Sequence, residues 1–292
     1  MKWLITGANG QLGRCLQDAL ALENLVLEHD IVTFSSSELD ITNEIAVSDL
    51  ITCTAPDIVL NAAAYTEVDK AESDTISAFK VNALGVSYLA NACKNINARL
   101  IHISTDYVFD GTSTTAYQPY DTAAPNTVYG STKLAGEQSV VNLGGLGCVI
   151  RTAWVFSEYG NNFLKTMLRL AETRDEFGVV GDQVGCPTYA GDLAKAIVAI
   201  GKADSFPSGV HHFSGDVVVS WWSFAREIHR QAVAQGIITK PPLLKQLSTD
   251  EYPTAAPRPA FSVLDCSSLW SLGIVQSDWK KAVDIVLSRL VT

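Results

Sequence analysis

Paired cysteines and long apolar runs are missing from this sequence. Its 292 residues include six cysteines, and none stands in a C-x-x-C pair, so neither a zinc ribbon nor a dithiol redox motif is indicated. No apolar run approaches the roughly 18 residues that a transmembrane helix needs, and the N-terminus has no cleavable signal pattern. We therefore expect a cytoplasmic protein without a membrane partner, with its cysteines reduced and mostly in the core.

Positive charge is also scarce. Lysine and arginine together number 21 against 31 aspartates and glutamates, for a formal net charge of −10. Nucleic acids and acidic membranes attract basic surfaces, so we expect neither as a partner. A small anionic ligand stays possible, because a few local cations are enough to line a pocket. The hydrophobic content of 47% is that of an ordinary globular protein.

Strands and helices alternate through the first half of the chain. Predicted strands cover 3–5, 31–34, 57–61, 100–104 and 148–151, and predicted helices cover 12–22, 44–52, 71–95 and 129–141. This alternation predicts the α/β class with a Rossmann-type, doubly wound parallel sheet that helices cover on both faces.

After about residue 155 the rhythm changes. A helix is predicted over 162–172 and two more near Leu193 and Trp222, while 178–187 and the proline-rich stretch 240–259 read as loops. We expect an NAD(P)-binding domain over residues 1–155. A smaller α/β domain over 156–292 would be mainly substrate-binding, and its elements can interleave with the first.

Three glycines follow the first predicted strand and open the first helix. The pattern Gly7-x-x-Gly10-x-x-Gly13 permits a sharp turn and lets a pyrophosphate approach the helix N-terminus. Its strand–turn–helix setting favours dinucleotide binding over a plain glycine turn. The spacing is similar to that of extended short-chain dehydrogenases.

The region after the second strand bears on the choice of cofactor. Asp40 can accept hydrogen bonds from adenine or ribose, or it can cap the next helix, a role that Thr42 or Asn43 would fill better. Residues 35–37 are serines, which would not repel a 2′-phosphate, and Arg14 follows the last glycine. Both observations lean towards NADPH over NADH, although Glu38 stands close by.

The third strand ends in Asn61 and a run of alanines, at the sheet edge where ligands bind in this fold. Small side chains there would let the backbone run close beneath a cofactor. The alternative is a strand end that is merely well packed.

Tyr129 and Lys133 carry the strongest chemical signal. Their spacing of i and i+4 places a phenol and an ammonium on one helical face. A phenol has a reference pKa of about 10, and a neighbouring cation lowers it towards the range that acid–base catalysis uses. Ser104, Thr105 and Asp106 end the preceding strand, and a hydroxyl there can stabilise a reacting carbonyl oxygen. Capping of nearby backbone is the alternative for these hydroxyls.

Several longer motifs resemble the dTDP-4-dehydrorhamnose reductases of the extended short-chain dehydrogenase/reductase superfamily. The resemblance runs from residue 1 to about 195 and returns at 258–265. The motifs are GANGQLG, LDIT, NAAAYTEVDKAE, STDYVFDG, YGSTKLAGE, RTAWVF, GNNF, DQVGCPTYAGDLA and RPAFSVLD. It implies NAD(P)H-dependent reduction of the 4-keto group of dTDP-4-dehydro-L-rhamnose to dTDP-L-rhamnose. Alternatives are a reductase of another 4-keto-6-deoxy nucleotide sugar and a non-catalytic, NADP-binding regulatory subunit.

The resemblance also implies roles for single residues. The catalytic triad would be Thr105, Tyr129 and Lys133. Substrate contacts would be Thr105, Asp106 and Trp154, with Val68 as a further candidate. Cofactor contacts would be Gly7, Gly10, Gln11, Leu12, Gly13, Asp40, Ile41, Ala63, Ala64, Tyr65, Tyr129 and Lys133. Tyr65 stands where the family usually has histidine.

Some members of that family form dimers through magnesium held by glutamates. In this sequence the corresponding places hold Cys15 and Ala190, and Arg14 is adjacent. Hard cations prefer oxygen ligands, so we expect no metal and a monomer or weak homodimer. Asp18 and Glu23 are the acids that could take over such a role.

Two aromatic pairs receive plainer interpretations. His211 and His212 lie in a predicted strand without a third metal ligand. Trp221 and Trp222 are expected in the core or at an interface.

Overall fold

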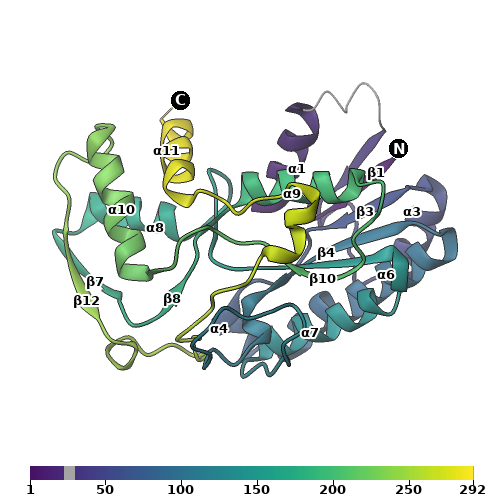
Figure 1. The fold of residues 1–292 in the computed structure, drawn as a ribbon, viewed down its shortest axis with the longest axis horizontal. Coiled ribbons are helices and arrows are strands. Elements are labelled where there is room, and N and C mark those ends of the chain that lie inside the picture. Colours follow the sequence, from purple (N-terminus) through teal and green to yellow (C-terminus); the bar gives the residue numbers. More distant parts are fainter. Residues whose placement is uncertain (23–29, 292) are drawn as a thin grey trace.

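A six-stranded parallel sheet forms the centre of the protein in a computed structural model that describes residues 1–22 and 30–291 (Figure 1). Its order is β10-β5-β4-β3-β1-β2, so the winding reverses between β1 and β3, which is where ligands bind in such sheets. The strands are β1 (Trp3–Thr6), β2 (Ile31–Phe34), β3 (Ile58–Asn61), β4 (Arg99–Thr105), β5 (Gly147–Thr152) and β10 (Gly209–His212).

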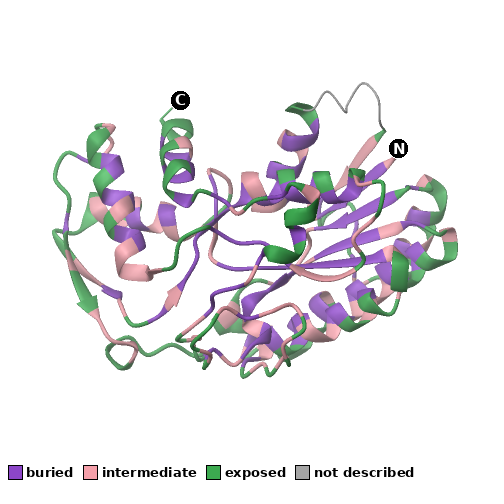
Figure 2. Cartoon of the chain, viewed as in Figure 1, coloured by how far each residue is buried: buried purple, intermediate pink, exposed green. Residues whose placement is uncertain are grey.

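Helices cover both faces of this sheet, which confirms the doubly wound α/β prediction. One face carries α1 (Gln11–Leu22) and α9 (Ala190–Lys202), and the other carries α3 (Glu44–Thr54), α6 (Gly85–Ile96) and α7 (Val128–Val141). Strand side chains alternate between faces. Trp3 and Ile5 therefore join the core under α1 and α9, while Leu4 joins the core under α3 and α6. Figure 2 shows the buried residues following the strands and the inner helix faces.

The second half of the chain contributes to both parts of the molecule. Helix α9 and strand β10 complete the main sheet. A second lobe, beside the sheet in Figure 1, has its own core and contains α8 (Phe163–Thr173), α10 (Trp221–Ala234) and α11 (Trp279–Leu290). Among the described residues, no helix is long and apolar enough to cross a membrane.

The predicted loops at 178–187 and 240–259 contain short strands, so that prediction was wrong in part. Their partners lie far away in the chain, and local sequence gives little sign of such pairing. The pairs are β7 (Glu176–Val180) with β12 (Leu243–Leu247) and β8 (Val184–Gly185) with β11 (Val219–Ser220). Outside these loops, β6 (Val155–Phe156) also pairs with β9 (Thr188–Tyr189).

The single helix predicted over 71–95 is also wrong. The chain forms α4 (Val68–Ala71), a break, α5 (Thr75–Phe79), a π-helical turn η1 (Lys80–Leu84) and then α6. Asp74 starts α5 by accepting from the backbone N–H of Ser77 at 3.4 Å. The apolar periodicity of the sequence continues across this break, so periodicity alone does not reveal where one helix ends and the next begins. The π turn matters because such turns are frequent at functional sites.

Candidate active site

The glycine turn between β1 and α1 provides a close-fitting cradle. Gly7 has φ +68°, and a Cβ on it would lie 2.6 Å from the backbone nitrogen of Ala63. Only glycine therefore allows this turn to approach the segment after β3. The turn leads directly into Gln11 at the N-terminus of α1, where free N–H groups favour an anion. These residues fit a dinucleotide pyrophosphate.

Asp40 and Ile41 follow β2 and differ in their surroundings. Asp40 is exposed, and its Oδ1 accepts from the backbone N–H and the hydroxyl of Thr42 at 2.9 and 2.8 Å. Asn43 caps α3 through the backbone N–H of Ala46, so Asp40 is not the cap. Ile41 is buried in the core beneath α6. Its backbone is thus the part of Ile41 that can face a ligand.

An acid does lie at the end of β2, which the serine run did not suggest. The Oε2 of Glu38 accepts from the backbone N–H and the hydroxyl of Ser35 at 2.8 and 2.6 Å. These bonds hold the pKa of Glu38 below its usual value. Arg14 places its guanidinium over the ring of Tyr159, 5.6 Å from the centroid. Both findings weaken the sequence argument for NADPH.

A buried amide, Asn82, fixes the segment that ends in Tyr65. Its Oδ1 accepts from the backbone N–H of Tyr65 at 2.9 Å, and its Nδ2 donates to the carbonyl of Tyr65 at 3.0 Å and to the hydroxyl of Thr132 at 3.2 Å. The predicted contacts Ala63, Ala64 and Tyr65 are thereby tied to α7. Sequence analysis missed Asn82. The available signal was a lone amide among the apolar residues around η1.

Tyr129 and Lys133 lie on α7, which packs unusually close to the end of β4. A Cβ on Gly130 would lie 2.1 Å from the carbonyl oxygen of Tyr107, so glycine is required beside Tyr129. The rings of Tyr107 and Tyr129 meet edge to face at 5.5 Å. This packing brings the end of β4 against α7, the helix that holds the predicted catalytic pair.

The surroundings of Tyr129 and Lys133 shift the pKa of both side chains. Burial raises the pKa of Tyr129 to about 12, while the hydroxyl of Thr105 lowers it and the charge of Asp106 raises it. Burial lowers the pKa of Lys133 to about 8, and Glu137 acts in the opposite direction. At neutral pH Tyr129 is therefore a phenol, the form that donates a proton.

Asp106, which follows Thr105, has a buried acceptor oxygen without a hydrogen-bond partner among the described residues. Its Oδ1 accepts from the hydroxyl of Thr105 at 2.9 Å. Its Oδ2 is buried and has no partner among the described residues. Burial raises the pKa of Asp106 to about 6. A buried polar atom without a partner is rare enough to need an explanation, and a ligand hydroxyl would supply one.

Trp154 stands two residues beyond Thr152, which pairs with Thr105 across β4 and β5. It has a left-handed backbone with φ +51°. Its ring stacks on Trp221, with centroids 3.5 Å apart and planes at 9°. Trp221 was expected only in the core or at an interface, and it proves to support a predicted substrate residue. Val68, the further candidate, begins α4 and is partly buried.

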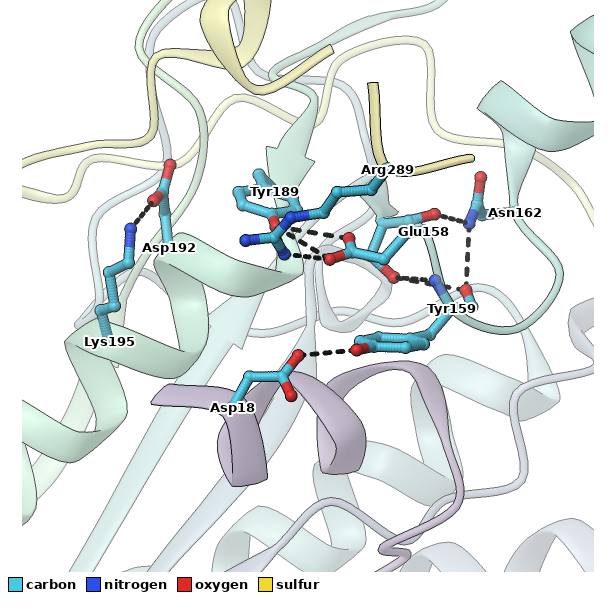
Figure 3. A network of polar contacts seen from close by, with 9 residues as sticks. Asp18, Glu158, Tyr159, Asn162, Tyr189, Asp192, Lys195 and Arg289 are labelled. Carbon is cyan, nitrogen blue, oxygen red and sulfur yellow. Dashed lines mark hydrogen bonds and ion pairs between the residues drawn. The ribbon is translucent and has the colours of Figure 1, made fainter. Parts of the chain in front are cut away.

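A separate polar network lies near Cys15, a position where the family resemblance would place a magnesium ligand (Figure 3). Glu158, with a side chain only 7% exposed, accepts from Arg289 and from the hydroxyl of Tyr189. Asp18 accepts from the hydroxyl of Tyr159 at 2.8 Å. Arginine and tyrosine donors therefore engage these carboxylates. Within residues 1–22 and 30–291, no three histidine, cysteine, aspartate or glutamate side chains gather as a metal site requires.

The other acid considered there, Glu23, lies outside the described residues. The two histidines of β10 have separate surroundings. His212 packs edge-on to Phe109 at 5.9 Å, and His211 contacts Ser268 at 3.1 Å.

Comparisons with known proteins agree with this geometry. The family model described as the RmlD substrate binding domain matches residues 1–292. A dTDP-4-dehydrorhamnose reductase of Aggregatibacter actinomycetemcomitans is 45% identical over 285 residues, which is 96% of each chain.

Two solved structures are also similar over nearly their whole length. A dTDP-4-dehydrorhamnose reductase from Clostridium acetobutylicum has a TM-score of 0.92 and 38% identity, with 100% of both chains covered. One from Bacillus anthracis, solved in complex with NADP, has a TM-score of 0.90 and 37% identity, with 99% of both chains covered.

Proposed function

The chain belongs to the RmlD family, and from that premise we propose that it reduces the 4-keto group of dTDP-4-dehydro-L-rhamnose to give dTDP-L-rhamnose, using NADPH or NADH. The observation that carries the proposal is the group formed by buried Thr105, Asp106 and Lys133 with partly buried Tyr129, which lies at the carboxyl edge of the sheet with the glycine turn. This group combines a proton donor, a carbonyl-binding hydroxyl and a cation next to a dinucleotide cradle.

Binding of the cofactor is assigned to three segments. The turn of Gly7, Gly10 and Gly13, with Gln11 and Leu12, would hold the pyrophosphate at the start of α1. Asp40 and the backbone of Ile41 would face the adenosine, and the segment Ala63, Ala64 and Tyr65 would lie beneath the cofactor. The bound nicotinamide supplies the hydride that reaches C4 of the sugar.

The protein's own residues handle the oxygen and its proton. On substrate binding, the hydroxyl of Thr105 would turn its proton from Oδ1 of Asp106 to the keto oxygen, where negative charge develops. Tyr129 would transfer its phenolic proton to O4, which converts the ketone to an alcohol once C4 has gained the hydride. Lys133 would hold the nicotinamide ribose and favour the tyrosinate left behind. Asp106, Trp154 and Val68 would contact the sugar.

Steady-state turnover of the nucleotide sugar, followed by nicotinamide absorbance and product identification, tests the proposal. Tyr129→Phe should leave cofactor binding nearly intact and lower kcat by about 100-fold or more, the range for losing a positioned acid. Tyr107→Phe is the matched control, because it removes a neighbouring phenol and keeps the ring contact. Near-native kcat in Tyr129→Phe would contradict the assignment.

Other outcomes separate the alternative functions. Turnover confined to a different 4-keto-6-deoxy nucleotide sugar would keep the chemistry and change the substrate. NADPH binding without turnover of any keto sugar would favour a regulatory subunit. Tight cofactor binding that Tyr129→Phe leaves unchanged is expected for both functions, so it would not by itself support a reductase.

We further propose a cytoplasmic location, no nucleic-acid partner, and a monomer or weak homodimer. All six cysteines are free thiols and five are buried, as expected in a reducing compartment. The net charge of −10 disfavours association with nucleic acid. Light scattering over a range of concentrations would measure the oligomeric state.

A further inference from the structure

A row of polar side chains crosses the core behind the catalytic lysine. Thr6 ends β1, Asn61 ends β3, His102 lies within β4 and Lys133 lies on α7, and all four are at most 2% exposed. The hydroxyl of Thr6 donates to Oδ1 of Asn61 at 2.7 Å. Nδ2 of Asn61 lies 3.0 Å from Nδ1 of His102, and Nε2 of His102 lies 3.3 Å from Nζ of Lys133.

The backbone fixes the orientation of the Asn61 amide. The N–H of Ala63 can only donate, and it lies 3.1 Å from Oδ1 of Asn61. That atom must therefore be the oxygen. The amide nitrogen consequently faces His102. Because an NH₂ group donates and does not accept, Nδ1 of His102 must accept and carries no proton.

The proton of the imidazole must then be on Nε2. A doubly protonated ring would place an N–H on Nδ1 against the amide donor of Asn61. Burial and the charge of Lys133 also hold the pKa of His102 well below its usual value. The neutral ring with its proton on Nε2 directs that N–H towards Nζ of Lys133. A free amine has a lone pair to accept it, whereas an ammonium has none.

We propose that His102 is a positioning residue that acts through Lys133: with its tautomer set by Asn61, it presents an N–H donor to the lysine nitrogen and favours the neutral amine over the ammonium. The arrangement itself follows from contacts in the cofactor-free protein. Its consequence for catalysis rests on the proposed reductase function. There, His102 makes Lys133 release its proton more readily beside Tyr129.

Other charged groups around Lys133 act differently. On α7 itself, Glu137 favours the ammonium. Arg151 of β5 binds that carboxylate through two bonds of 2.9 and 2.7 Å, which reduces its influence. Tyr129 is also on α7, and Asp106 follows β4 and acts on Tyr129. The carbonyl of Ile103 accepts from Nζ at 2.5 Å in either protonation state. None of these groups directs an N–H donor at Nζ of Lys133, so none of them disfavours the ammonium in the way that His102 does.

Asn61→Asp inverts the tautomer with little change of shape. The aspartate carboxylate keeps the hydrogen bonds from Thr6 and Ala63. It also accepts a hydrogen bond from Nδ1 of His102, which then carries the proton. Nε2 then offers a lone pair to the ammonium of Lys133. Nitrogen-15 NMR of histidine-labelled, cofactor-free protein should show an unprotonated Nδ1 at His102 in the wild type and an unprotonated Nε2 in the variant.

Carbon-13 NMR of labelled lysine in the same samples should show Lys133 titrating about one pH unit higher or more in Asn61→Asp. The high-pH limb of kcat for keto-sugar reduction should move upward by a similar amount. His102→Gln should shift both in the same direction without adding a charge, because its amide oxygen can accept from the ammonium. A merely structural role would lower kcat or stability and leave both titrations in place.

Thr6→Val is the matched control. It removes the outermost bond of the row, but Ala63 still fixes the amide of Asn61, so the tautomer and both titrations should stay unchanged. A protonated Nδ1 in the wild type, or an unmoved Lys133 titration in both Asn61→Asp and His102→Gln, would overturn the proposal. An enzyme inactive on nucleotide sugars with the expected NMR results would contradict only the proposed function.

Discussion

The ring of Trp221, at the first position of α10, lies parallel to the ring of Trp154 at a centroid distance of 3.5 Å. Trp154 has φ +51°, a left-handed backbone that costs a non-glycine residue roughly 1–2 kcal/mol. The stack from the second lobe helps to hold this strained residue at the edge of the main sheet. The position of Trp154 therefore depends on both lobes.

Trp221→Ala should raise the KM for the nucleotide sugar by about tenfold, because Trp154 loses the surface that holds it. The KM for the cofactor should change little. The control is Trp222→Ala, since Trp222 packs beneath Arg226 and donates to the carbonyl of Leu244. That variant should lose stability without the same rise in sugar KM. Equal effects of both variants on KM would contradict a specific role for Trp221.

Asp106 should make stability fall as pH rises. Burial raises its pKa from 3.8 to about 6, so between these values the folded state binds more protons than the unfolded state. The stabilisation is complete below about pH 4 and is lost as pH rises through about 6. A shift of about two units corresponds to about 3 kcal/mol in the free energy of unfolding.

Asp106→Asn should remove this dependence, so its stability relative to wild type should increase between pH 4 and pH 7. Urea unfolding across that range measures the difference. Asp110→Asn is the control, because hydrogen bonds from Thr112 lower the pKa of Asp110; its effect on stability falls below about pH 4, so its difference from wild type should stay nearly constant across this range. A constant difference between Asp106→Asn and wild type would show that Asp106 does not titrate as described.

Glu38 should limit the use of NADPH. We expect NADPH to support activity at least as well as NADH, but the carboxylate held against Ser35 would repel a 2′-phosphate near the end of β2. Glu38→Gln should raise the ratio of kcat/KM for NADPH over NADH by about fivefold. Glu44→Gln, an exposed acid in the first turn of α3, should leave the ratio unchanged. A roughly tenfold preference for NADH in the wild type would refute the expected cofactor use.

Chelation should affect neither activity nor assembly. Hydride transfer with Tyr129 as the proton donor requires no Lewis acid. In the network of Figure 3, Glu158 already accepts from Arg289 and Asp18 from Tyr159. Turnover and light scattering before and after EDTA treatment measure both properties. A loss of about half the activity or more, restored by magnesium, would contradict this. Asp18→Asn would then identify whether Asp18 is a ligand.

Local sequence was sufficient for much of the catalytic assignment. The i,i+4 spacing of Tyr129 and Lys133 needs only a helix to place both on one face. The glycine turn needs only a strand and a helix on either side. The family resemblance placed Thr105 and Asp106 next to them, and the structure shows both acting on the pKa of Tyr129.

Other features required the folded chain, because they depend on residues that are distant in sequence. The predicted helix over 71–95 failed at a turn that apolar periodicity does not detect, and the same region contains Asn82, which binds Tyr65 across 17 positions. Glu38 was close in sequence, but only the turn after β2 brings its carboxylate back to Ser35. Sequence patterns report which face a side chain takes and not which partner it meets there.

The sequence by itself determined the doubly wound sheet, the cofactor turn and the Tyr129–Lys133 pair, because each follows from short-range periodicity and steric requirements. Only the tertiary structure decided how these groups are tuned. The proton on His102 is set by an amide 41 positions earlier, on a neighbouring strand, and Trp154 is held by a ring from the second lobe. Hydrogen-bond direction and burial belong to the packed assembly of strands and helices, so no single segment encodes them.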